Sequence, residues 1–215
     1  MAGQIGPQST VPLAALSRRV FGDWERFASG RGGTALMFTW AAAESTIWPV
    51  IPDFLLLPMS AAQRRRPYIP LLATILGSAL GATAWQVWSF FAPEAALRGL
   101  RKVPFVRADQ ILAVQVRIGR TGTRALLAQP WSGIGLKVWA PVAQVGGVPA
   151  GRALLAFTAA RALRMGLVTA VTALLARIFR GWLEVLAVPL GAMYLVVFFP
   201  IWWRLATRMY PNEAS

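Results

Sequence analysis

The sequence contains no cysteine and no histidine. Disulfide bonds, zinc and haem sites, thiol nucleophiles and imidazole acid–base chemistry are therefore excluded. Charged residues are also scarce, at 14% of the 215 residues, whereas 56% are hydrophobic. This balance is typical of membrane proteins rather than of soluble domains. We expect no metal site, no cofactor and no enzymatic activity.

Negative charge is rare as well, with 8 acidic against 22 basic residues and a net charge of +14. All the basic residues are arginine except Lys102 and Lys137. A strongly basic protein first suggests nucleic-acid binding. Here the arginines stand between apolar runs, which favours contact with anionic lipid headgroups instead. The 10 Trp and 11 Phe residues suit anchoring at the membrane interface.

Three apolar segments are long enough to cross a bilayer as helices, at residues 67–91, 153–176 and 182–203. The first carries no charge and contains a small-xxx-small pattern at Gly77 and Gly81. Such a pattern allows close contact between helices, although glycines that face lipid would produce the same sequence pattern. We therefore predict an all-α polytopic membrane protein with about three spanning helices.

Two further segments predict helices at the membrane surface. Residues 12–27 place an apolar stripe beside arginines, which fits either a surface helix or a helix packed on its own protein. Residues 92–124 are polar and basic, and Val114, Val116 and Ile118 alternate as they would in a strand. We favour a helix for this segment.

Residues 34–60 combine an apolar composition with two acids and several prolines. In one straight helix Glu44 and Asp53 would lie on opposite faces, and one carboxylate would face lipid at a cost of roughly 2.5–3.5 kcal/mol. Pro49 and Pro52 would each cost about 3 kcal/mol in a helix interior. We therefore predict a re-entrant hairpin with a helix through Glu44, a break at these prolines and a short helix from Asp53. Asp53 could also serve as the N-cap of that helix.

A second interrupted segment covers residues 125–150, and we expect Pro141 to break it. It contains Lys137 at a place that corresponds to Asp53 in the first half. Each half then continues into a long apolar helix. Paired interrupted segments of this kind indicate an inverted repeat with a binding site near the membrane midplane.

The quoted segments resemble a known family. The stretch ESTIWPVIPDFLLLPM is similar to the E-S-x-x-x-P-x-P-P-D-x-x-L-x-P-M signature of YqaA-like proteins in the DedA superfamily, also called the SNARE-associated or VTT-domain family. In the second half, GIGLKVWAPVAQVGG resembles the P-I-P-x-K-V-x-T-x-x-A-G pattern of that branch. LLAFTAARALRMGLVTA resembles its following F-x-x-x-S-x-x-x-R-x-x-R-F helix. The resemblance covers about residues 34–180.

The resemblance implies two re-entrant hairpins that meet inside the bilayer and movement of lipids or lipid-linked phosphates coupled to protons. By position, Glu44 and Asp53 match the acids of the family and would bind protons. Lys137 matches a basic residue of the second hairpin, and Arg161 and Arg164 match arginines of the following helix. These three cations would bind phosphate. The implied partners are membrane lipids and protons, without nucleic acid.

Two positions depart from the pattern. The wider superfamily has an additional arginine six positions before Lys137, where this chain has Trp131. The segment SGIG stands where the branch has prolines. Both departures bear on the nature of the substrate.

Other functions remain open at this point. A drug–proton exporter could use the same two acids, and a membrane assembly protein would need no transport at all. An aspartyl protease is disfavoured because no second Asp motif supplies a dyad that shares a proton. Lys137 could merely extend to the interface, and Arg161 and Arg164 could be topology charges or pair with Glu44 structurally.

We assign residues 1–33 to a tail and surface helix, 34–206 to the DedA-like transmembrane domain and 207–215 to a C-terminal tail. The expected location is a bacterial inner membrane. Arg64–Arg66 is the densest basic cluster, which favours a cytoplasmic N-terminus on the positive-inside rule.

Overall fold

A computed structural model describes residues 12–63 and 66–208 of the chain. The predicted tails and two arginines of the basic cluster, Arg64 and Arg65, lie outside these residues. Every regular element in the described part is helical, as predicted. In chain order the elements are α1 (Leu13–Ser29), α2 (Arg31–Glu44), α3 (Asp53–Ala62), α4 (Tyr68–Phe91), α5 (Pro93–Arg101), α6 (Ala108–Thr121), the 3₁₀ helix η1 (Gly122–Trp131), α7 (Leu136–Val145), α8 (Ala150–Ile178) and α9 (Arg180–Arg208).

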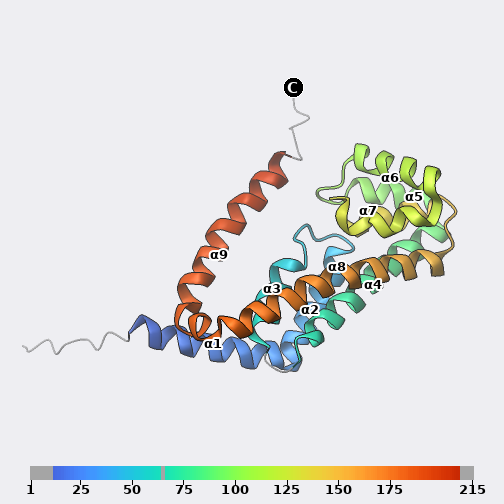
Figure 1. The fold of residues 1–215 in the computed structure, drawn as a ribbon. Helices are drawn as coiled ribbons and strands as arrows, with labels where there is room; N and C mark the ends of the chain where they lie inside the picture. Colours follow the sequence, from blue (N-terminus) through green and yellow to red (C-terminus); the bar gives the residue numbers. More distant parts are fainter. Residues whose placement is uncertain (1–11, 64–65, 209–215) are drawn as a thin grey trace, which may run out of the picture.

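Helix α4 is the central element, because it packs against α2, α7 and α8 (Figure 1). Its two glycines face α2. A Cβ atom at Gly77 would collide with the carbonyl oxygen of Phe38, and one at Gly81 would lie 2.8 Å from the carbonyl oxygen of Ala42. The small-xxx-small pattern is therefore a helix contact, and the lipid-facing alternative is wrong for these glycines.

We expect Gly77→Ala to destabilise the protein by about 1–3 kcal/mol, because the added methyl group forces the α2 and α4 backbones apart. The measurement is the thermal unfolding midpoint of the purified protein in detergent. Gly119→Ala is the matched control, since a Cβ there meets nothing within 4 Å and alanine is the better helix former. Equal unfolding midpoints for Gly77→Ala and the wild type would contradict this packing.

The break in the first half falls where the sequence predicts it. Helix α2 ends at Glu44 and α3 begins at Asp53, with Pro49 and Pro52 between them. Side chains from outside the break satisfy its backbone carbonyls: Trp40 donates to Val50 at 3.2 Å, Trp85 to Thr46 at 3.3 Å and Lys137 to Trp48 at 3.1 Å. Irregular backbone at membrane depth requires such partners. The re-entrant position in a bilayer stays a prediction.

The second break lies earlier than predicted. Helix α7 runs from Leu136 to Val145 through Pro141, so the assignment of Pro141 as the break is wrong. The chain instead turns between η1 and α7 at residues 132–135, where Gly133 has a φ of 71°. Lys137 then lies in the first turn of α7, much as Asp53 opens α3. The inverted repeat itself stays a prediction.

The segment at 92–124 forms two short helices and the start of η1, so the helix is confirmed over the strand. On α6 the buried side chains are Ile111, Val114 and Ile118, which have helical spacing, whereas Val116 is exposed. These side chains join α7 and part of α4 in the larger of two apolar cores. The smaller core lies around α3, between α2, α4 and α8.

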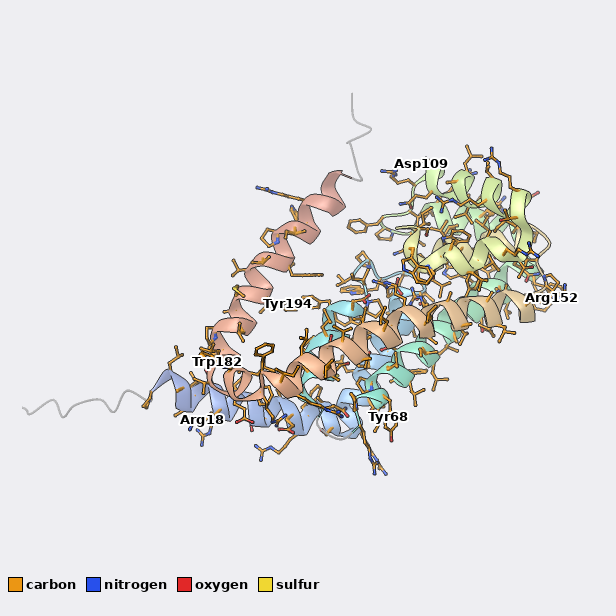
Figure 2. All side chains as sticks on the ribbon, in the orientation of Figure 1. Arg18, Tyr68, Asp109, Arg152, Trp182 and Tyr194 are labelled. Carbon is orange, nitrogen blue, oxygen red and sulfur yellow. The ribbon has the colours of Figure 1, made fainter. Side chains whose placement is uncertain are left out.

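Helix α9 stands apart from the rest of the protein (Figure 1). It follows α8 after a single residue, Phe179, and packs mainly on α1. Figure 2 shows Tyr194 on the face of α9 that is turned to α3, where its hydroxyl donates to the carbonyl oxygen of Phe54 at 3.0 Å. None of the apolar window at Arg180–Ile201 is buried. An apolar helix with such a surface requires lipid or protein around it.

Helix α1 also presents apolar side chains outward. Leu13, Leu16, Val20 and Phe27 of the predicted stripe are exposed, whereas its fifth member, Trp24, is half-buried and donates to the carbonyl oxygen of Pro58 at 3.1 Å. Phe21, outside the stripe, is buried and contacts Arg180 of α9. A helix packed only on its own protein would cover that stripe. Its exposure is consistent with the predicted contact to the membrane surface.

Candidate functional site

The first element of the site is a buried ion pair between α2 and α8. The Arg161 guanidinium contacts the Glu44 carboxylate, with Nη2 3.0 Å from Oε2 and 3.3 Å from Oε1. Only 7% of the Arg161 side chain and 6% of the Glu44 side chain are exposed. Ser78 of α4 accepts a hydrogen bond from Arg161 Nη1 at 2.6 Å, and Ser45 donates to Glu44 at 3.2 Å. The pair therefore links three helices.

A second ion pair lies one helical turn further along α8. Arg164 Nη1 is 3.2 Å from Oδ2 of Asp53, the first residue of α3. Asp53 forms no side-chain hydrogen bond to the start of its own helix, so the N-cap interpretation is wrong. Arg164 is more accessible than Arg161, because 33% of its side chain is exposed against 7% for Arg161. The Asp53 side chain is 10% exposed. Arg161 and Arg164 share one face of α8, as residues three apart do.

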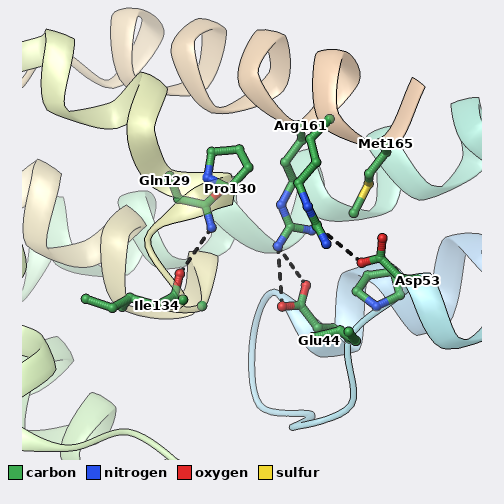
Figure 3. A pocket seen from close by; sticks show the side chains of 12 residues that line it. Glu44, Asp53, Gln129, Pro130, Ile134, Arg161 and Met165 are labelled. Atoms are coloured by element: carbon green, nitrogen blue, oxygen red, sulfur yellow. Dashed lines mark hydrogen bonds and ion pairs between the residues drawn. The ribbon is translucent and has the colours of Figure 1, made fainter. Parts of the chain in front are cut away.

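Both pairs line one cavity of about 160 Å³ (Figure 3). Its walls come from the first break (Ile51, Pro52), from the turn at 133–135 and its flanking residues Gln129 and Pro130, and from α8. A water molecule needs only about 10–15 Å³ by a comparable measure. The cavity therefore has room for several water molecules or for a small polar group.

Lys137 lies beside this cavity. Its Nζ donates to the carbonyl oxygen of Trp48 at 3.1 Å, and its side chain runs past Gly135 in the cavity wall. The residue is 6% exposed, so it does not extend to the interface, and that interpretation is wrong. Among the residues that the structure describes, no carboxylate forms an ion pair with Lys137.

The structure thus brings together all five predicted ionisable residues, Glu44, Asp53, Lys137, Arg161 and Arg164. Three cations and two carboxylates therefore lie in this region, which leaves one net positive charge that Lys137 contributes beside the cavity. Trp131, which replaces an arginine of the superfamily pattern, is 62% exposed and adds no polar group to the cavity. In the described part of the chain, no cluster of acids could hold a metal ion.

Sequence reasoning missed two polar residues at the site. Ser78 stands between the two glycines of α4, and a polar residue inside a charge-free span was the available signal. Gln129 stands just before Pro130 and lines the cavity from the side of η1. Apart from that proline, nothing in the neighbouring sequence indicates a role for Gln129.

Three helices, Tyr68–Phe91, Ala150–Ile178 and Arg180–Ile201, are long and apolar enough to cross a membrane. Together with the composition, they indicate a helical membrane protein. Comparisons with protein-family models, with curated proteins and with solved structures find no match. The DedA resemblance therefore stays a prediction from the sequence motifs.

Proposed function

We propose that the protein is an integral membrane transporter that moves an anionic phosphate-bearing lipid across the bilayer together with protons. The observation that carries this proposal is the composition of the cavity. Two carboxylate–arginine pairs line it, and a buried lysine that forms no ion pair with any described residue lies beside it. Buried charges are normally paired, so an unpaired cation favours an anionic ligand.

The two ion pairs give the site a way to exchange protons for phosphate. Once an acid takes up a proton, its arginine loses its counterion and can bind phosphate with two parallel hydrogen bonds. Release of the proton restores the ion pair and expels the anion. Movement of the lipid across the membrane is then coupled to movement of protons.

The pairs are not equivalent in this scheme. The Arg164 side chain is 33% exposed, whereas the Arg161 side chain is buried and also donates a hydrogen bond to Ser78. We assign the first contact with phosphate to Arg164 and the first proton to Asp53. Glu44 and Arg161 form the deeper pair, which opens only when the ligand has entered.

In the membrane, this site would lie between two re-entrant segments, the break at 45–52 and the turn at 132–135. Helix breaks in two halves of a transporter commonly surround the binding site near midplane. Non-helical backbone is tolerated there because it lines a polar cavity. We place the protein in a bacterial inner membrane, as the resemblance implies.

Transport of a cationic drug is less well supported by the geometry. Such a substrate would need the two carboxylates, and both already hold arginines. The excess positive charge would also repel it. An assembly protein without transport would have no use for a polar cavity at an ion-pair cluster.

Lys137→Met separates these possibilities. We expect phosphatidylglycerol flux in vesicles to fall about tenfold or more, because a charge-assisted contact contributes about 1.5–3 kcal/mol. The unfolding midpoint should change little, since the removal of a buried charge offsets the loss of the hydrogen bond to the Trp48 carbonyl. Flux is measured as loss of fluorescence when dithionite reaches labelled lipid in reconstituted vesicles.

Lys102→Met is the control, because Lys102 is the other lysine of the chain and is exposed. It should leave flux unchanged. Normal lipid flux in the Lys137→Met variant, or ethidium efflux that persists while lipid flux is absent in the wild type, would contradict transport of an anionic lipid.

A further inference from the structure

Gln129 is the one uncharged side chain at the cavity whose hydrogen bonding is incomplete among the described residues. The residue is 4% exposed and lines the cavity from η1. Its Nε2 donates to the carbonyl oxygen of Ile134 at 3.2 Å, and its Oε1 has no partner. Figure 3 shows Gln129 across the cavity from Asp53.

The orientation of this amide follows from its neighbour. The carbonyl of Ile134 can only accept a hydrogen bond, so the NH₂ group of Gln129 must point to it. The oxygen is then left as a buried acceptor without a donor. Leaving such a group unsatisfied costs free energy, and native structures contain few of them.

None of the nearby donors reaches Oε1 of Gln129. Arg161 donates to Glu44 and Ser78, Arg164 to Asp53, and Lys137 to the carbonyl of Trp48. Gln129 lines the cavity, so a donor on a molecule bound there would satisfy this oxygen. We propose that Gln129 accepts a hydrogen bond from a hydroxyl group that the ligand carries next to its phosphate. The inference rests on the proposed function, because it uses the same cavity and the same anion.

The charge of the cavity selects between the possible donors. An ammonium headgroup would meet the positive charge of Lys137 beside the two ion pairs of the cavity, and the excess of positive charge grows when Asp53 or Glu44 is protonated. A hydroxyl carries no charge and suffers no such repulsion. The substrate class that fits is therefore a polyol phosphate, such as a glycerol or sugar headgroup, rather than an aminoalcohol phosphate.

Two matched pairs of probes test this specificity, each differing only in the hydroxyl groups. Short-chain phosphatidylglycerol is compared with short-chain phosphatidylmethanol, and glycerol phosphate is compared with methyl phosphate. Binding to the purified full-length protein in detergent is measured by calorimetry, independently of flux. We expect the wild type to bind the hydroxyl-bearing member about fivefold more tightly, the typical effect of one neutral hydrogen bond.

Gln129→Met keeps the length of the side chain and removes the acceptor, so both members of a pair should bind equally. Gln144→Met is the control, because Oε1 of Gln144 is also buried without a partner but lies away from the cavity. It should keep the preference. Persistence of the preference in a folded Gln129→Met variant would overturn the inference.

If the Gln129→Met variant does not fold, binding of the probe pairs to the wild type alone still tests the inference. Equal binding within each pair, or no binding of any probe, overturns the inference. A preference seen with the lipids supports a headgroup as the source of the hydroxyl, and one seen only with the soluble esters supports a free polyol phosphate. In the latter case hydroxyl recognition stands, while lipid transport fails.

Discussion

Replacing Arg161 with methionine is expected to destabilise the protein by about 3–5 kcal/mol, one of the largest effects we predict. The substitution leaves Glu44 as a buried carboxylate without a counterion and removes the donor to Ser78. Removing one partner of a buried pair costs more than the pair itself contributes, because the remaining charge is desolvated. The measurement is the unfolding midpoint in detergent.

The double variant Glu44→Gln with Arg161→Met should recover much of this loss, since no charge remains buried at the pair. Arg98→Met is the control, because Arg98 and its partner Glu94 are both exposed and such pairs contribute little. A double variant as unstable as Arg161→Met alone would show that Arg161 acts through packing rather than through Glu44.

Replacing Asp53 with asparagine is expected to reduce lipid flux by about tenfold or more and to weaken its dependence on pH, which then rests on Glu44 alone. The amide cannot take up or release a proton, so Arg164 stays in one state. Stability should change less than in the Arg161→Met variant, because the partly exposed Arg164 keeps contact with water. Flux is measured in vesicles at several pH values.

Asp109→Asn is the matched control for this variant. Asp109 also pairs with an arginine, Arg107, but lies at the exposed start of α6, away from the cavity. It should transport like the wild type. An Asp53→Asn variant that keeps both its flux and its pH dependence would remove Asp53 from the mechanism.

Local chemistry explains which parts of the fold the sequence predicts. Pro49 and Pro52 stand only three residues apart and each would remove a backbone hydrogen bond, so a break between α2 and α3 follows from the sequence. Gly77 and Gly81 signal a close contact in the same local way. The face shared by Arg161 and Arg164 follows from helix periodicity. Each of these features depends only on near neighbours in the chain.

Features that depend on distant neighbours could not be assigned in this way. Which acid pairs with which arginine depends on the positions of α2 and α3 beside α8, and the role of Ser78 depends on α4. Gln129 becomes informative only when the partner of its amide is known.

Pro141 shows a different kind of error. A proline removes one hydrogen bond, here the one to the carbonyl of Lys137, and α7 continues past it. The turn uses Gly133 instead, because its φ of 71° is accessible to glycine at little cost. In the SGIG segment, glycine rather than proline was the signal for the break.

Coupling between protons and lipid is the central claim, and one measurement tests it directly. Wild-type protein is reconstituted into vesicles with labelled phosphatidylglycerol in both leaflets, a pH gradient is imposed, and the lipid in each leaflet is then quantified by dithionite. The account predicts accumulation of the lipid in one leaflet beyond that in protein-free vesicles, and its loss when Glu44→Gln and Asp53→Asn are combined. A leaflet distribution that matches protein-free vesicles with and without the gradient would contradict it.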